Sequence, residues 1–194
     1  MAIISGTKAA EVIEVLHEIP KEKRDAVTEI TLDIGYSRKL IARKCFTKAI
    51  QVKDRFQVRK LVLEASQDVR IKYRWQAIDD ENTAISKAKQ ESKTYFFSNR
   101  DSPKQLLARG RYILYKSQDK WTPNQKQRAD ILFEQYLDIQ KAYKLFQGLK
   151  LIFNLDFIKE AARVKLAKWY NDVEDSGFKA FNIVSNTIKL NYDT

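Results

Sequence analysis

The chain has 194 residues, of which 44% are hydrophobic and 31% are charged, so it can bury a core and is not a disordered tail. It contains only 5 Gly and 3 Pro, which excludes a turn-rich sandwich or barrel and favours long helices. The one cysteine, Cys45, and one histidine, His17, exclude a disulfide framework, a Cys/His zinc site and a Ser-His or Cys-His relay, so any chemistry rests on carboxylates.

The sequence shows no targeting signal. No apolar run approaches the roughly 18 residues of a membrane span, and the first six residues lack the basic start and the length of a signal peptide. We therefore expect a cytoplasmic protein with no membrane partner.

Residues 1–58 alternate strand-like and helical patterns. We predict strands over 2–4, 27–33 and 49–54, with a helix after Thr7 as N-cap and a short helix over 40–45 between them. Helices between successive strands are typical of a parallel sheet with right-handed crossovers. Because an open sheet has about five or six strands, we expect further strands before Met1, after Thr194 or both.

From Phe56 onward the apolar period is 3.6 residues, as in helices. Apolar residues at 58, 62, 65 and 69 predict a long helix toward Tyr95. Ser102 and Thr122 each precede Pro, with Gln three residues on, which predicts two helix starts. Later stripes predict two helices over 132–153 with a bend at Gly148, a helix ending at 176–177 and a last helix over 181–188.

These patterns predict a mixed α/β chain that is mostly α. Residues 1–58 form a partial parallel α/β sheet, and residues 59–194 form an all-helical module. The switch from a mixed to a purely helical period at Phe56 sets the boundary between them.

The net charge of +11 is concentrated in one stretch. Residues 87–128 carry 11 Lys and Arg against 3 Asp and Glu, and they also contain six aromatic residues. Basic and stacking residues together indicate a nucleic-acid surface, whereas the alternative is that the rings are core and the cations are a solvated face. The predicted contacts to double-stranded DNA are Lys104, Arg109, Arg111 and Lys116.

Two carboxylates end predicted strands. Asp33 follows the second strand and Asp54 follows the third, and functional groups gather at the carboxyl ends of parallel strands. Charged oxygens at adjacent strand ends could hold a divalent metal ion. The alternative is that each Asp is a helix N-cap or turn residue.

Two sequence blocks resemble a known family. Residues 27–33, VTEITLD, and 49–58, AIQVKDRFQV, resemble the "V-x-x-V-T-L-D" and "A-x-x-V-x-D-R-F-H-V" blocks of bacterial insertion-sequence transposases, the ISL-three family with a DDE catalytic domain. Gln57 stands where the family usually has His. The likeness continues through the Lys/Arg-rich helices and covers most of the chain.

The resemblance implies an RNase H-like core interrupted by a helical insertion, in which Asp, Asp and Glu bind two Mg²⁺ or Mn²⁺ ions and cut and join DNA. Asp33 matches the second acidic residue, a catalytic metal ligand, while Asp54 and Arg55 match supporting motif residues. The first Asp is expected on a strand before Met1. Asn182 occupies the Glu position in the best internal match, so the Glu helix is expected beyond this chain.

We therefore expect a fragment of a DNA transposase that lacks two of the three catalytic carboxylates, is inactive alone and does not bind Mg²⁺ or Mn²⁺ tightly. One alternative is a non-catalytic helical DNA-binding or interaction protein derived from a transposase. Another is a metal-independent α/β regulatory domain with a helical output module. A homo-oligomer and association with the bacterial nucleoid are compatible with either of the DNA-binding interpretations.

Overall fold

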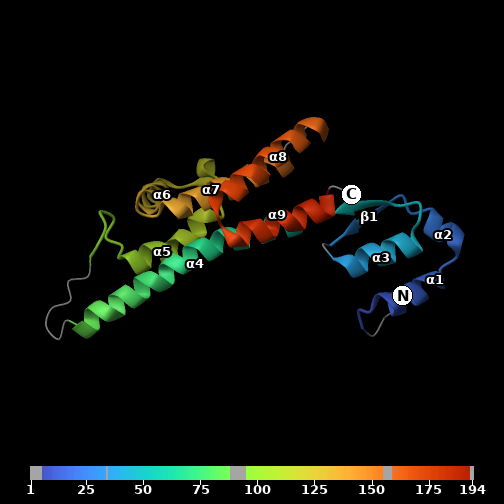
Figure 1. The fold of residues 1–194 in the computed structure, drawn as a ribbon, viewed down its shortest axis with the longest axis horizontal. Helices are drawn as coiled ribbons and strands as arrows, with labels where there is room; N and C mark the ends of the chain where they lie inside the picture. The colour runs from blue at the N-terminus through green and yellow to red at the C-terminus, as the bar shows by residue number, and fades with distance from the viewer. Residues whose placement is uncertain (1–5, 34, 88–94, 155–158, 193–194) are drawn as a thin grey trace. The chain divides into compact units, whose positions relative to one another are not determined.

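Residues 6–33, 35–87, 95–154 and 159–192 are described by a computed structural model of the chain. The chain divides into two compact units, Met1–Val58 and Arg59–Thr194. Figure 1 shows their elements in chain order. The boundary between the units falls at the start of the long helix, where the apolar pattern becomes purely helical.

The first unit contains a parallel pair of strands joined by a helical crossover. Strand β1 pairs with β2 in a register that runs from Glu29 opposite Ile50 to Leu32 opposite Lys53. The parallel pairing that the sequence predicts is therefore confirmed. The elements of this unit are α1 (Ala9–His17), α2 (Lys21–Asp25), β1 (Glu29–Leu32), α3 (Tyr36–Cys45) and β2 (Ile50–Lys53).

Helix α1 packs against α3, and Arg24 ties the ends of these helices together. Its guanidinium donates from Nη1 to the carbonyl of Cys45 at 2.9 Å and from Nε to the carbonyl of Ile19 at 3.0 Å. Cys45 is buried, and burial raises the pKa of its thiol. The lone cysteine is therefore a packing residue. Helix α2, which supplies Arg24, was not predicted.

Several details of the predicted first unit differ from the structure or lie outside it; α3, for example, begins at Tyr36, four residues before the predicted start. Thr7 is not the N-cap of α1, because Lys8 has the extended cap conformation and its carbonyl accepts the first helical bond, from Val12 N at 3.2 Å. Strand β1 begins at Glu29, two residues later than predicted. The strand predicted over residues 2–4 lies outside the described residues.

In the described residues of the second unit, all regular secondary structure is helical. The long helix α4 (Arg55–Lys87) starts in the last residues of the first unit and buries Val58, Val62 and Ala65, as the apolar stripe predicts. Residues 88–94, over which its predicted continuation runs, lie outside the described residues. The other elements are α5 (Pro103–Leu114), the 3₁₀ turn η1 (Gln118–Lys120), α6 (Pro123–Gln135), α7 (Leu137–Asn154), α8 (Lys159–Ser176) and α9 (Lys179–Tyr192).

Helices α5 and α6 begin with the two predicted capping boxes. The Ser102 hydroxyl accepts from the Gln105 N–H at 3.3 Å, and the Gln105 side chain accepts from the Ser102 N–H at 3.0 Å. Thr122 and Gln125 make the same reciprocal pair at 3.3 and 3.2 Å. Each box satisfies two backbone groups at the helix end and fixes where the helix begins.

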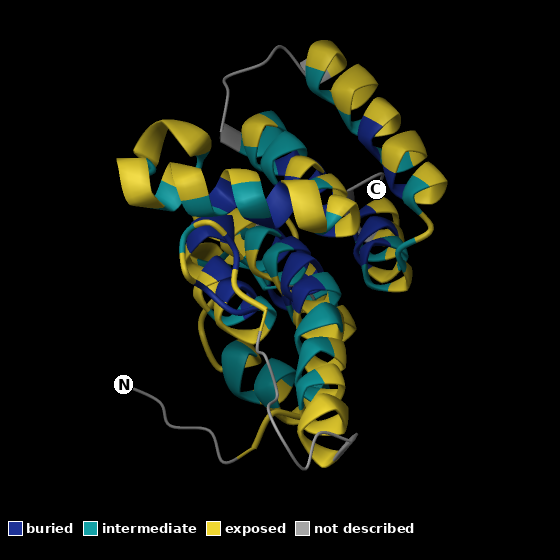
Figure 2. Cartoon of the chain, turned by 90° about the vertical axis from the view of Figure 1, so that its left-hand side faces the viewer, coloured by how far each residue is buried: buried dark blue, intermediate teal, exposed yellow. Residues whose placement is uncertain are grey.

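The core of the second unit lies where α5, α6 and α7 pack together. Rings of Trp121, Phe133 and Tyr143 lie 5.3 to 6.1 Å apart, and the Trp121 indole donates to the Ile113 carbonyl at 3.1 Å. Figure 2 shows the buried positions as dark blue stretches on helices whose other turns are exposed. The buried cluster consists of Phe97, Leu106, Leu107, Ile113, Leu114, Ala129, Leu132, Phe133, Ile139 and Tyr143.

Helices α7, α8 and α9 extend this packing. Trp169 of α8 donates to the Leu145 carbonyl of α7 at 2.9 Å. Helix α8 ends where predicted, because Gly177 follows it with φ +70°, a conformation that favours glycine. The predicted bend at Gly148 is wrong: α7 runs through it, and the break lies at Tyr136, which leaves the helical conformation between α6 and α7.

Candidate functional site

The two strand-end carboxylates lie side by side in the sheet. The parallel register continues past Leu32 and Lys53, because the Asp54 N–H donates to the Leu32 carbonyl at 3.0 Å. Asp33 and Asp54 therefore follow neighbouring positions at the same carboxyl edge, where paired strands are about 4.8 Å apart. This edge is the place where a parallel sheet collects functional groups.

Each of these carboxylates already has a local partner. Asp33 Oδ2 lies 3.0 Å from Nη1 of Arg38, a residue in the first turns of α3, and the Asp33 side chain is 36% exposed. Asp54 Oδ1 accepts from the Phe56 N–H at 2.8 Å, so Asp54 caps the start of α4. Arg55 is the exposed first residue of that helix. The sequence singled out Asp33, Asp54 and Arg55 but not Arg38.

The sheet edge offers oxygen ligands but not a complete metal site. Hard divalent ions need several charged oxygens, and two-metal chemistry needs carboxylates on both ions. Within the described part of the chain, no three His, Cys, Asp or Glu side chains are grouped so that they could hold a metal. Asp33 is the carboxylate at this edge that a cation could reach by displacing only a surface ion pair.

The four predicted DNA contacts fall into two pairs in the structure. Lys104 Nζ lies 3.0 Å from Glu81 Oε2, and Arg109 is ion-paired with Asp101, so both cations have carboxylate partners. Arg111 and Lys116 are exposed. Tyr115 lies close enough to raise the pKa of Arg111, and Lys116 Nζ donates to the uncharged side chain of Gln125 at 3.3 Å. Of these four cations, the two without a carboxylate partner therefore lie at the C-terminal end of α5 and just beyond it.

Asp101 is a buried ion-pair centre that the sequence reading missed. Its side chain is 1% exposed, pairs with Arg109, accepts from Arg128 Nε at 2.8 Å and accepts from Asn99 Nδ2 at 3.0 Å. It holds the segment before α5 against α6. The available signal was that Asp101 is one of only three acids within residues 87–128, directly before a predicted helix start.

The aromatic residues of the basic stretch divide between core and surface. Phe97 is buried and Trp121 packs against the core, as the alternative interpretation requires. Tyr95, Phe96, Tyr112 and Tyr115 are exposed; Tyr112 on α5 follows Arg111, and Tyr115, which caps the end of α5, precedes Lys116. Exposed rings beside exposed cations remain suited to stacking and phosphate contacts.

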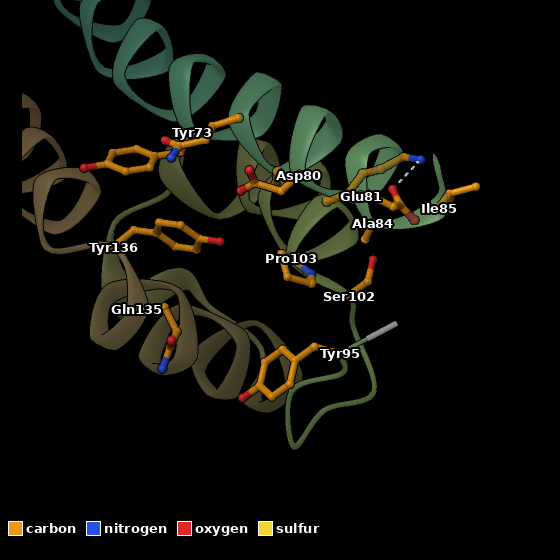
Figure 3. Close-up of a pocket in the computed structure, with 13 residues that line it drawn as sticks. Tyr73, Asp80, Glu81, Ala84, Ile85, Tyr95, Ser102, Pro103, Gln135 and Tyr136 are labelled. Atoms are coloured by element: carbon orange, nitrogen blue, oxygen red, sulfur yellow. Dashed lines mark hydrogen bonds and ion pairs between the residues drawn. The ribbon is translucent and has the colours of Figure 1, made fainter. Parts of the chain in front are cut away.

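A pocket of about 470 Å³ lies between α4, the start of α5 and the end of α6 (Figure 3). The rings of Tyr73 and Tyr136 are 5.2 Å apart in its wall, and Tyr73 donates to Asp138 Oδ2 at 2.7 Å, which raises the pKa of Tyr73 to about 12. Asp80 and Glu81 also line it. Lys104 also lines it and pairs with Glu81, so the negative charge that remains in the lining is that of Asp80, which suits a cationic or neutral group better than a phosphate.

Among the helices that the structure describes, none combines the length and the apolar character needed to cross a lipid bilayer.

Comparison with known proteins gives one family. A family model described as a transposase, that of the DDE transposases of the ISL-three type, matches residues 1–194. No curated protein and no solved structure matches the chain. The match covers both units, including the two strand-end motifs and the whole helical unit. The chain belongs to the ISL-three family of DDE transposases.

Proposed function

We propose that this chain supplies one catalytic carboxylate, Asp33, and a DNA-binding helical unit to metal-dependent DNA cleavage and strand transfer. Membership of a transposase family implies interaction with DNA in general. The observation that carries the finer proposal is the placement of Asp33 beside Asp54 at one carboxyl edge of a parallel sheet. Arg55 and Asp54 act as supporting residues, because Asp54 fixes the start of α4 next to Asp33.

The first unit fits part of an RNase H-like sheet, and the second fits its helical insertion. Two strands form a very small sheet, and the outer edge of each is unpaired in the described residues. Ile50 is 70% exposed and Val52 is 37% exposed, which is costly for strand residues of this kind. We infer that further strands pair with this sheet in the working assembly and bring the other catalytic carboxylates to Asp33.

The residues of this chain fit one ligand position for Mg²⁺ or Mn²⁺, not a complete site. In the family the ions would polarise the scissile phosphate and activate the attacking oxygen. Asp33 would be the ligand, with Arg38 as the partner that it must release. We therefore propose that the chain alone binds these ions weakly and does not carry out strand transfer.

Titration of the purified chain with Mg²⁺ or Mn²⁺ tests this part of the proposal. Isothermal calorimetry should give binding weaker than micromolar for the wild type. Asp25→Ala is the matched control, because Asp25 also makes a surface ion pair, at 3.2 Å to Lys48. Micromolar binding that disappears in Asp33→Ala but survives in Asp25→Ala would contradict an incomplete site.

A non-catalytic DNA-binding protein of transposase descent is the second candidate. The observation that favours it is that both strand-end carboxylates are engaged, Asp33 with Arg38 and Asp54 as a helix cap. The two candidates share DNA binding and differ at Asp33. If Asp33→Ala leaves transposition unchanged when the whole element is tested in cells, the non-catalytic function is correct.

We propose that Arg111 and Lys116 are the main contacts to DNA and that Lys104 and Arg109 contribute less. Phosphate neutralisation releases counterions, so binding should fall steeply between about 50 and 200 mM salt. Arg109 is not a clean test residue, because its removal would leave the buried Asp101 short of a partner. The double change Arg111→Gln with Lys116→Gln avoids this problem.

The control for that experiment is Arg163→Gln with Lys168→Gln. Both residues are exposed on α8, and the pair removes the same net charge. Affinity for a DNA duplex, followed by fluorescence anisotropy, should fall more in the α5 variant, and the slope of affinity against salt should drop by about 2. No binding by the wild type at the lower salt, or equal losses in both variants, would contradict this DNA surface.

A further inference from the structure

Arg70 of α4 is a buried cation whose hydrogen-bond partners are uncharged. It is 5% exposed, and it donates from Nη1 to the Leu107 carbonyl of α5 at 2.8 Å and from Nε to Gln67 Oε1 at 2.7 Å. Both acceptors are neutral. A buried charge is normally paired with an opposite charge, because desolvation is expensive otherwise. The buried position of Arg70 therefore indicates that an anion binds nearby.

Two further arginines increase the positive charge around Arg70. Arg74 is one turn along α4, and Arg111 is one turn beyond Leu107 on α5. Burial lowers the pKa of the Arg70 guanidinium, and the charges of Arg74 and Arg111 lower it further. In the described residues, no carboxylate lies within ion-pair distance of any of the three. Lys104 and Arg109, by contrast, are each paired with an acid.

The same stretch of α4 contains buried groups that could donate hydrogen bonds and have no acceptor. Arg74 Nε, Gln67 Nε2 and Ser66 Oγ are buried without a hydrogen-bond partner. Residues 67, 70 and 74 share one face of the helix, and the Gln67 amide is fixed beside Arg70 by their bond. Unpaired buried donors are rare in proteins and commonly mark a missing ion or water. Unpaired donors next to uncompensated cations indicate an anion.

We propose that Arg70, Arg74 and Arg111 form a phosphate-binding site between α4 and α5 that takes one phosphate of the DNA backbone. The inference rests on the proposed DNA binding and names the groups that carry it. Arginine suits this role, because its planar fork of donors matches phosphate oxygens. Arg111 is exposed beside Tyr115, so a phosphate can reach it from the surface. Arg70 is buried and adds positive charge on the inner side of the site.

Negative charge limits how far the phosphate-binding site extends along α4. Farther along the helix, Asp80 lines the pocket of Figure 3, where its charge would repel phosphate. One helix therefore presents uncompensated cations in its middle and carboxylates toward its end. A duplex held at Arg74 and Arg111 should extend away from the pocket.

Inorganic phosphate tests the site without DNA. Sodium phosphate, compared with sodium chloride at matched ionic strength, should raise the thermal unfolding midpoint of the wild type, because a ligand bound by the folded state stabilises it. The rise should disappear in Arg74→Gln and in Arg111→Gln and persist in Arg163→Gln. Arg70 is left unchanged, because it also joins α4 to α5. An equal rise in all variants would overturn the phosphate site.

DNA binding by the same variants identifies the source of the phosphate. Arg74→Gln and Arg111→Gln should each weaken duplex binding by about tenfold relative to Arg163→Gln, the size expected for one charged hydrogen-bonded contact. Arg111→Lys should keep part of the affinity. If the wild type binds DNA but Arg74→Gln and Arg111→Gln bind it as well as Arg163→Gln does, this phosphate site is wrong, DNA binding itself stands, and Arg111 is removed from the proposed DNA contacts.

Another outcome would support the phosphate site but overturn the proposal that DNA supplies the phosphate. If the wild type binds no DNA and yet phosphate stabilises it through Arg74 and Arg111, free phosphate is the ligand and the DNA source is overturned together with the proposed function. Circular dichroism of each variant excludes loss of folding as the cause. Arg74 and Arg111 lie toward or at the surface, so either variant can carry the test if the other unfolds.

Discussion

The two units of the chain bury very different amounts of apolar surface. In the described part of the first unit, the buried apolar residues are Ala42, Cys45 and Val58, and the strand residue Ile50 is 70% exposed. The second unit buries a continuous cluster around Leu132 and adds Trp169, Phe181 and Ile188. Burial of apolar surface is the main stabilising term in folding. The second unit therefore has much the larger apolar core.

The same contrast holds for charge. Asp101 in the second unit is 1% exposed and shared by Arg109 and Arg128, while Asp33 in the first unit is 36% exposed and pairs with the exposed Arg38. A buried carboxylate organises the fold, and an exposed one is available for exchange.

Removal of Asp101 should have the largest effect on stability. Asp101→Ala leaves two arginines without their carboxylate and should lower the free energy of unfolding by about 3–5 kcal/mol. Asp33→Ala should cost less than about 1 kcal/mol, because surface pairs contribute little. Denaturant unfolding of both variants measures the difference. Equal losses would mean that the buried pair does not hold α5 in place.

Truncation of an apolar side chain should also lower the free energy of unfolding more in the second unit than in the first. Leu132→Ala should cost about 2–5 kcal/mol, because Leu132 is fully buried among α5, α6 and α7. Ile50→Ala is the matched change on the exposed sheet and should cost far less. A large loss in Ile50→Ala, measured in chemical denaturation, would show that the sheet of the isolated chain is covered after all.

Loss of a capping hydroxyl should have an intermediate effect. Ser102→Ala and Thr122→Ala each remove an acceptor for the N3 amide and should cost about 1 kcal/mol. Ser98→Ala is the control, because Ser98 is exposed and lies before the cap. Thermal unfolding should show lower midpoints for the two cap variants alone. Unchanged midpoints would mean that the helix starts are fixed by packing.

Stability should also change at alkaline pH. Burial raises the pKa of Tyr143 to about 12, and the hydrogen bond to Asp138 raises that of Tyr73 to about 12. The ordinary pKa of tyrosine is 10.0. Because both pKa values are raised in the folded state, the stabilisation from these two protonated side chains is complete below pH 10.0 and is lost as the pH rises through about 12. Absorbance titration should show a late tyrosinate step that shrinks in Tyr143→Phe. Tyr36→Phe, at an exposed position, should leave that step intact.

Sequence patterns predict the parts of this molecule that depend on neighbours in the chain. Ser102 and Thr122 cap their helices because the hydroxyl, Pro and Gln of each box lie within four positions. The parallel pairing follows from a helix between two strands. Asp54 satisfied two local descriptions at once, strand end and helix cap, and the structure places it in both.

Partners far apart in the sequence could not be predicted. Asp101 pairs with Arg128, 27 positions away, and Arg70 bonds the carbonyl of Leu107, 37 positions away. Nothing local distinguishes Arg70 from a solvated arginine, since residues 59–86 are electrically balanced as a whole, and Arg128 is one of many cations in a basic stretch. Glycine is a weak helix former, so the sequence predicts a bend at Gly148. The packing of Leu145 and Leu149 overrides that preference in α7.

The parallel strands also set an order for folding. Each residue of β1 pairs with one 21 positions later in the chain, as Glu29 does with Ile50, whereas the capped starts of α5 and α6 form within single turns. Closing a long loop costs chain entropy before any pairing is gained, and proteins rich in such distant contacts fold more slowly. The sheet that carries Asp33 should therefore form after the helices.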